Sequence, residues 1–254
     1  MDALELSAVF AWSFAVSFFG GLVGLVLGNL RLPLIVLVAS SPAAGAGANV
    51  AISGVAALTS SYGHWRGGRI DWRLFGWMAP TSLVGAVAGG LIAGELPDRL
   101  LLGAISVIVL YGAVEVWRYR RPTAERGTEL PSRRSLLVNA ALVGLGVGLL
   151  GGFVGLILGS LRLPAMVRWV GVRPYAAVGT NAAVGAVVGV GGLIGHLPSG
   201  IDWGILAVGA AAAMPAAYLG ARFTGRLDET QLVHAMAAIL VVSGGAMAAQ
   251  AIFG

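Results

Sequence analysis

Continuous apolar runs of about 20 residues recur along the whole chain, and polar residues gather in short segments between them. Each run is long enough to cross a hydrocarbon core about 30 Å thick as a helix. The runs do not alternate in the way that strands of a transmembrane barrel do, so they predict membrane-spanning helices. We place the runs at residues 4–27, 43–62, 74–93, 100–117, 136–158, 175–194, 203–223 and 231–252.

The residues between the runs reveal an internal duplication. The segment GGLVGLVLGNLRLP at residues 20–33 returns as GGFVGLILGSLRLP at residues 151–164, with 11 of 14 positions identical. Further along, matching positions carry the same Pro, Asn and Asp at nearly constant spacing: Pro42 and Pro174, Asn49 and Asn181, Asp71 and Asp202. The chain therefore divides into a first transmembrane repeat at residues 1–118, an Arg-rich linker at residues 119–134 and a second repeat at residues 135–254.

These patterns predict an all-α integral membrane protein of two homologous repeats, each with about four full spans plus a broken or re-entrant short helix. The short piece follows Arg-Leu-Pro, at residues 32–39 and again at residues 163–170. We expect the Gly-rich stretch before it to unwind, and a new helix to begin at the proline, which suits the first turn of a helix.

The arginine distribution predicts that the two repeats are inverted relative to each other. The polar segment from Arg118 to Arg134, which is the linker and the residue before it, holds six arginines and marks the cytoplasmic side. The loop at residues 62–74 holds three arginines, whereas its counterpart at residues 196–202 holds none. Inversion needs an odd number of crossings per repeat, so the first run and the short piece must form a hairpin or two short crossings. Both termini are then expected outside, in a multi-pass protein of the bacterial cytoplasmic membrane.

Composition excludes several classes of function. The chain is 57% hydrophobic and 11% charged, whereas soluble domains carry about a quarter charged residues. It has no cysteine, and all 16 basic residues are arginine. Without lysine there is no phosphate-binding loop for ATP, and no catalytic motif is present, so we expect no enzyme activity, cofactor or metal site. The net charge of +5 reports membrane orientation rather than nucleic-acid binding.

Arg31 and Arg162 occupy equivalent positions beside the two expected breaks. An arginine inside an apolar region is costly, so it tends to face a cavity or a partner. Broken helices in inverted-repeat transporters meet near the midplane, and their N-termini favour anions. The two guanidinium groups are therefore predicted to bind a substrate carboxylate or sulfonate. The alternative is that each reaches the interface and contacts lipid phosphate.

A second set of polar residues follows each short piece. Ser41 and Asn49 in the first repeat, and Thr180 and Asn181 in the second, are predicted to hydrogen-bond substrate oxygens. The alternative for each is a hydrogen bond between helices, which is common for Asn, Ser and Thr in membrane bundles. His64 and His196 match each other at the ends of equivalent helices. These two histidines are predicted to relay protons in coupled transport. The alternative is that each is a loop histidine at the membrane interface with no role in transport.

Two Gly-Gly-rich segments ending in Leu-x-Leu-Pro, followed by Gly179-Thr180-Asn181, resemble the sulfite exporter TauE/SafE family. The resemblance covers essentially the whole chain. It implies a secondary transporter for sulfite, sulfonates, sulfoacetate or related anions, driven by an ion gradient. The first repeat departs from the pattern, because it reads Gly47-Ala48-Asn49 where the second keeps Gly-Thr-Asn.

The sequence therefore predicts a secondary transporter of small organic or sulfur-containing anions that works by alternating access around a midplane site. Its expected partners are the anion, a coupled proton or sodium ion and the bilayer, and an oligomer is compatible with the pattern. Two alternatives remain: an anion channel of the same architecture, and an accessory membrane protein that transports nothing.

Overall fold

The computed structural model describes residues 2–91, 98–119, 133–154, 156–197 and 200–253. The first repeat contains α1 (Ala3–Val23), α2 (Gly28–Val38), α3 (Pro42–Arg66), α4 (Trp72–Leu91) and α5 (Asp98–Trp117). The second contains α6 (Arg133–Val154), α7 (Gly159–Ala165) with the π-helix η1 (Met166–Val170), α8 (Pro174–His196), α9 (Trp203–Thr224) and α10 (Glu229–Phe253). Both repeats thus have the expected order, a short helix after the first of four long ones. Most of the linker, residues 120–132, lies outside the described residues.

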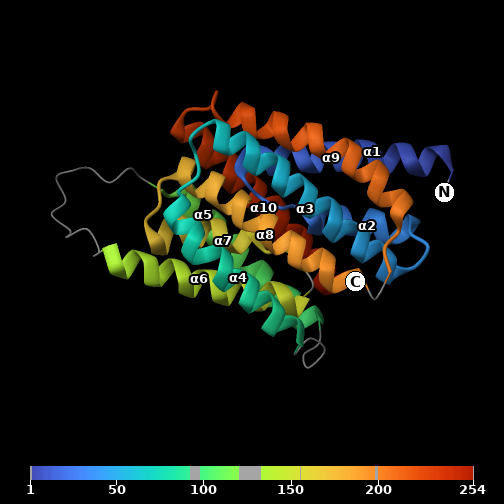
Figure 1. Ribbon diagram of the computed structural model, residues 1–254, viewed down its shortest axis with the longest axis horizontal. Helices are drawn as coiled ribbons and strands as arrows, with labels where there is room; N and C mark the ends of the chain where they lie inside the picture. The colour runs from blue at the N-terminus through green and yellow to red at the C-terminus, as the bar shows by residue number, and fades with distance from the viewer. Residues whose placement is uncertain (1, 92–97, 120–132, 155, 198–199, 254) are drawn as a thin grey trace.

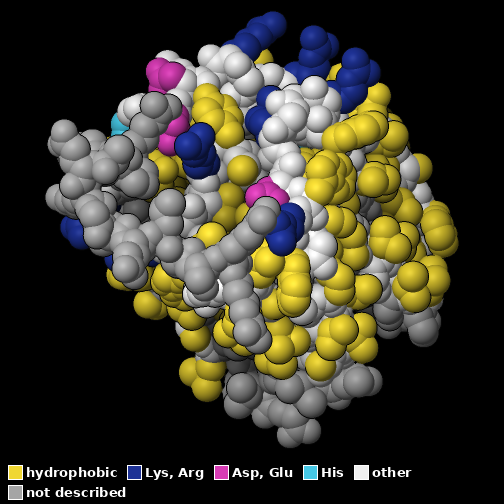
Figure 2. Space-filling view, turned by 60° about the vertical axis from the view of Figure 1, so that its left-hand side comes forward, with side chains coloured by type: hydrophobic (Ala, Val, Ile, Leu, Met, Phe, Trp, Pro, Cys, Tyr) yellow, Lys and Arg dark blue, Asp and Glu magenta, His cyan; other side chains and the backbone are white. Residues whose placement is uncertain are grey.

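Within the described residues, four helices are long and apolar enough to cross a membrane: α1, α8 as far as Ile194, α9 and α10. That is fewer than the four full spans per repeat that the sequence predicts. The 25-residue helix α3 is rich in Gly, Ser and Ala, and it packs against α2, α8 and α9, so most of its surface meets protein. Large apolar side chains such as Leu37, Val107 and Ile252 instead point outward, as lipid-facing residues do. Figure 2 shows such side chains covering one flank.

The first long helix and the short helix form the expected hairpin. Helix α1 ends at a left-handed Gly24, and α2 then runs back antiparallel to α3, with Gly28 beside Ser53 and Val36 beside Gly45. The expected helix start at the proline is wrong, because α2 begins at Gly28 and includes Pro33. A proline inside a helix leaves the carbonyl four residues earlier without its N–H partner. Gln250 of α10 donates to that carbonyl, on Asn29, at 3.1 Å.

The first helix of each repeat packs against a helix of the other repeat. Helix α1 packs along α9, and its counterpart α6 packs along α4. Counterpart helices also meet across the centre in opposite directions. In the α3–α8 pair Gly54 lies against Gly189 and Val50 against Gly192, while in the α5–α10 pair Gly103 lies near Ala251 and Leu110 near Gly244.

Arginine side chains are distributed unequally between the two ends of the helix bundle. The end where α5 finishes and α6 begins, at the left of Figure 1, is here called the linker end. Both chain termini lie toward the opposite end. Among the arginines whose side chains the structure describes outside the interior, only Arg99 is at the opposite end. The others belong to segments at the linker end: Arg66, Arg69, Arg73, Arg118, Arg168, Arg173, Arg222 and Arg226. Figure 2 shows that arginine side chains gather on this face.

Candidate functional site

Two breaks in the helices meet near the centre of the molecule. Helix α1 closes with hydrogen bonds from Gly24 and Leu25 back to its last turn, and the chain is non-helical at residues 24–27. Gly24 has a φ of 65°, and a Cβ there would overlap the Val178 carbonyl, so the turn requires glycine. In the second repeat, Leu156 bonds back to Gly151 in the same way. The start of α7 then approaches the first break, since a Cβ on Gly159 would lie 3.3 Å from the Val26 nitrogen.

Asn49 and Asn181 hold these breaks in place. The side-chain nitrogen of Asn49 donates to the Gly28 carbonyl at 3.1 Å, and that of Asn181 donates to the equivalent Gly159 carbonyl at 3.2 Å. Asn181 also donates to the Gly24 carbonyl of the first break, at 2.8 Å, so it connects the two repeats. The Gly24 carbonyl lies in the break and needs a partner away from water, which Asn181 supplies, while the bonds to Gly28 and Gly159 fix the starts of the two short helices.

Arg31 lies inside the protein with several neutral partners. Only 2% of the residue is exposed, so it does not reach a lipid headgroup. Its Nε donates to Asn49 Oδ1 at 3.0 Å, and Nη2 donates to Ser53 Oγ at 2.6 Å and to the Asn49 carbonyl at 3.4 Å. Nη1 donates to Ser17 Oγ at 3.4 Å. Helices α1 and α3 thus surround this guanidinium with hydroxyl and amide oxygens.

Arg162 is buried to the same degree but has fewer hydrogen-bond partners among the described residues. It is 1% exposed, and Nη1 donates to Asn181 Oδ1 at 3.2 Å, matching the Arg31–Asn49 pair. Its Nε is buried and has no hydrogen-bond partner within the described residues. Across these residues, no hydrogen bond or ion pair joins Arg31 or Arg162 to a carboxylate. Two positive charges therefore lie in the interior without a negative partner there.

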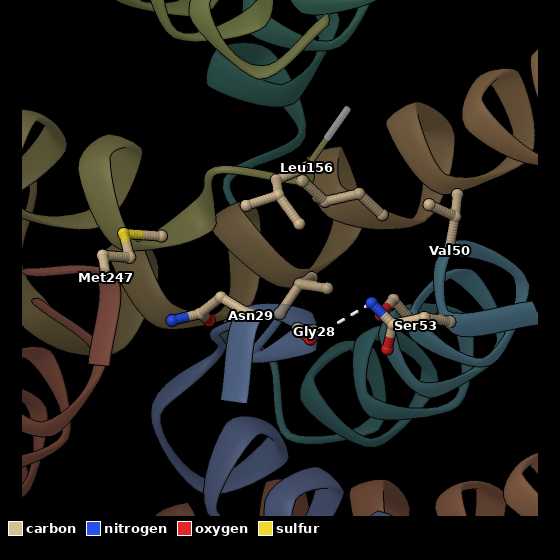
Figure 3. Close-up of a pocket in the computed structure, with 9 residues that line it drawn as sticks. Gly28, Asn29, Val50, Ser53, Leu156 and Met247 are labelled. Atoms are coloured by element: carbon tan, nitrogen blue, oxygen red, sulfur yellow. Dashed lines mark hydrogen bonds between the residues drawn. The ribbon is translucent and has the colours of Figure 1, made fainter. Parts of the chain in front are cut away.

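A small cavity lies where the breaks meet. Figure 3 shows Leu156 of the second break facing Gly28 and Asn29 at the start of α2, and the dashed line marks the bond from Asn49 to Gly28. A second small cavity adjoins the Arg31 side chain, between Ser17 and Ser53. Each has a volume of about 10 Å³, which is room for about one water molecule.

Ser41 and Thr180 lie away from the two arginines' hydrogen bonds. Ser41 is exposed and caps α3 by accepting the Ala44 N–H at 3.2 Å. The start of α3 is therefore at the surface. Thr180 is buried, and its Oγ1 accepts the Asp71 N–H at 2.9 Å, which ties α8 to the start of α4.

His64 is buried near the linker end, in a joint between several helices. Arg69 Nε donates to His64 Nδ1 at 3.0 Å, so the ring carries its proton on Nε2 and donates it to the Gly21 carbonyl at 2.9 Å. Arg69 also donates to the carbonyls of Gly63 and, in α9, Ala221. This Arg69–His64 joint links the ends of α1, α3 and α9. His196 ends α8, but its side chain lies outside the described residues.

Sequence reasoning missed Ser17, Ser53 and Arg69. Ser53 follows Asn49 by one helical turn, so it shares a face of α3 with Asn49, and that spacing was available as a signal. Ser17 lies in an apolar run and Arg69 in a loop. Nothing in the sequence distinguishes either from its neighbours, because their partners come from distant segments.

Comparisons with known proteins agree on a family. The family model described as "Sulfite exporter TauE/SafE" matches residues 9–247. The probable membrane transporter protein YjnA of Bacillus subtilis is 26% identical over 246 residues, covering 89% of this chain and 94% of the relative. The probable membrane transporter protein YdhB of the same organism is 23% identical over 199 residues, covering 78% and 81%. No solved structure matches the chain.

Proposed function

The chain belongs to the sulfite exporter TauE/SafE family of membrane transporters, and from that premise we propose that it carries small organic or sulfur-containing anions, such as sulfite, a sulfonate or sulfoacetate, by secondary transport. The observation that carries the proposal is the pair of buried guanidinium groups, Arg31 and Arg162, beside two helix breaks. A buried charge without a counter-ion is costly. A bound anion supplies the missing charge and accepts the forked donors of arginine.

The packing supports alternating access between inverted repeats. Counterpart helices α3 and α8 are antiparallel, as are α5 and α10, which supports repeats of opposite direction in a bilayer whose normal follows the helices. Inverted-repeat transporters bind their substrates where broken helices meet near the midplane, and the meeting of the two breaks supports a site there. Because each cavity admits about one water molecule, an anion binds only when the breaks move apart.

The charge separation supports an orientation. The linker end carries most of the described arginines, and positive residues favour the cytoplasmic side. We therefore place the linker end in the cytoplasm and both termini outside, in the bacterial cytoplasmic membrane. Reporter fusions at the linker and the C-terminus test this, and activity from the same side at both positions would refute it.

The Arg69–His64 joint gives a physical route for proton coupling. Neutral His64 accepts from Arg69 through Nδ1, and a protonated ring has no lone pair there to accept with. Protonation would also place two positive charges in contact. Binding of a proton therefore breaks the joint and loosens the linker end. Sodium coupling is the alternative.

Flux assays in proteoliposomes test transport. We expect uptake of sulfite or methanesulfonate that follows a proton or sodium gradient and is lost in the Arg31→Ala, Arg162→Ala double variant. Arg73→Ala is the matched control, since Arg73 is an exposed arginine outside the site. Flux that responds only to the anion's own gradient would instead identify a channel. If the double variant transports as well as the parent, these arginines are not the anion site.

A further inference from the structure

The two arginines beside the breaks have unequal surroundings despite their equivalent positions. Arg31 donates to Ser17 on α1 and Ser53 on α3. The positions that match these serines in the second repeat are Gly148 and Gly185. Both hydroxyl groups that serve Arg31 are thus missing around Arg162.

Close packing excludes a side chain at one of these two glycines and tolerates a small one at the other. A Cβ on Gly148 would overlap the Ser82 carbonyl of α4, so no side chain fits there. A Cβ on Gly185 would lie 2.9 Å from a methyl group of Val26, which a small rotation of that side chain relieves. Replacement at Gly185 is therefore feasible, whereas replacement at Gly148 displaces a helix.

The N–H donors of Arg162 are consequently more available to a ligand than those of Arg31. Within the part of the chain that the structure describes, its Nε is buried without a partner, and Nη1 donates to Asn181. A buried donor without an acceptor destabilises the protein, and a bound anion removes that cost. At Arg31 an anion gains less, because it must first displace Asn49 or the serine hydroxyls from the donors.

We propose that the anion of the proposed function binds directly to Arg162, while Arg31 is a positioning residue that holds the first break. The inference rests on the proposed function and sharpens it to one side of the site. The Nε–Nη edge of a guanidinium matches two oxygens on one central atom. The ligand class is therefore a carboxylate, sulfonate or sulfite, rather than a halide or another monatomic anion.

Anion binding to purified protein tests this division, with calorimetry against sulfite, methanesulfonate and chloride at constant ionic strength. We expect the two oxyanions to bind at least tenfold more tightly than chloride. We expect Arg162→Gln to weaken oxyanion binding about 100-fold, and Arg31→Gln to weaken it less than tenfold. Gly185→Ser gives Arg162 the hydroxyl that Arg31 already has, and should weaken binding about tenfold, with Gly185→Ala as its size control.

Thermal unfolding without anion provides a second readout. Arg162→Gln removes an under-partnered buried charge and should leave the unfolding temperature unchanged or raise it. Arg31→Gln removes hydrogen bonds from α2 to α1 and α3 and should lower it. The parent should be stabilised by sulfite, and Arg162→Gln should lose that shift.

The outcomes separate this inference from the proposed function. Oxyanion binding that is lost in Arg31→Gln and kept in Arg162→Gln overturns the inference and leaves anion transport standing, as does an equal loss in both. Binding of chloride as tight as that of sulfite overturns the oxyanion assignment. If the parent binds none of the three anions, the proposed function and the inference both fail.

Discussion

The first and second repeats share their breaks, yet the first repeat places more polar side chains around its own. Ser17 and Ser53 serve Arg31, where Gly148 and Gly185 stand near Arg162. Both repeats contain the helix break because the break depends on Gly, Pro and Asn at fixed spacing, which both repeats have. The difference teaches that a duplication preserves the place of a site more strictly than its chemistry. Three predictions test how far the repeats differ.

Asn181→Ala is expected to have the largest effect. Asn181 holds carbonyls of both breaks, on Gly24 and Gly159, and accepts from Arg162. Its removal leaves buried polar groups unpaired at about 1–3 kcal/mol each. We expect the free energy of unfolding in detergent to fall by about 2–4 kcal/mol and transport to be lost. In Asn49→Ala the loss of stability should be smaller, since the side-chain amide of Asn49 bonds within the first repeat and, among the described residues, to nothing in the second. Equal losses would contradict the comparison.

Arg69→Ala should have an intermediate effect, by opening the linker end. The variant loses hydrogen bonds to His64, Gly63 and Ala221. The position that matches Arg69 in the second repeat is Gly200, which has no side chain to form such bonds. The parent chain has no cysteine, so a single Ala56→Cys beside the Arg31 cavity is its only thiol. We expect Arg69→Ala to raise the rate of thiol labelling from the linker side about tenfold.

The matched control for labelling is Arg73→Ala, which removes the same charge from the same end. His64→Ala removes the acceptor of the Arg69 Nε and should raise the labelling rate in the same direction, but by less than Arg69→Ala does. A labelling rate that is unchanged in both variants would show that the linker end opens elsewhere.

Asp202→Asn should have the smallest effect. Burial raises the pKa of Asp202, but hydrogen bonds from the Ile205 and Ser40 N–H groups outweigh it and hold the pKa below its usual value. A lowered folded pKa contributes stability above the unfolded pKa, and this is lost as the pH falls through the folded value. We expect a slightly lower unfolding temperature for Asp202→Asn at neutral pH and none of the difference in strong acid. A difference that persists in acid would indicate a role other than charge.

The sequence by itself determined the class of protein, the duplication and the order of long and short helices. Apolar runs longer than a bilayer's core and repeated Gly, Pro and Asn positions are local signals, readable without any contact. They also placed Arg31 and Asn49 beside one break, and Arg162 and Asn181 beside the other. The start of α2 was misplaced, because Gln250 from the far end of the chain supplies the bond that makes Pro33 tolerable inside a helix.

Only the tertiary structure decided which side chains meet. In the folded protein Ser41 lies at the surface and caps α3, and Thr180 accepts a hydrogen bond from the Asp71 N–H. The tertiary structure also gave Arg31 two serine partners and left the Arg162 Nε with none among the described residues. Hydrogen bonds in a membrane interior join residues from distant helices, so their presence depends on how the helices pack. Sequence spacing cannot encode that packing, and this is why the two equal-looking arginines differ.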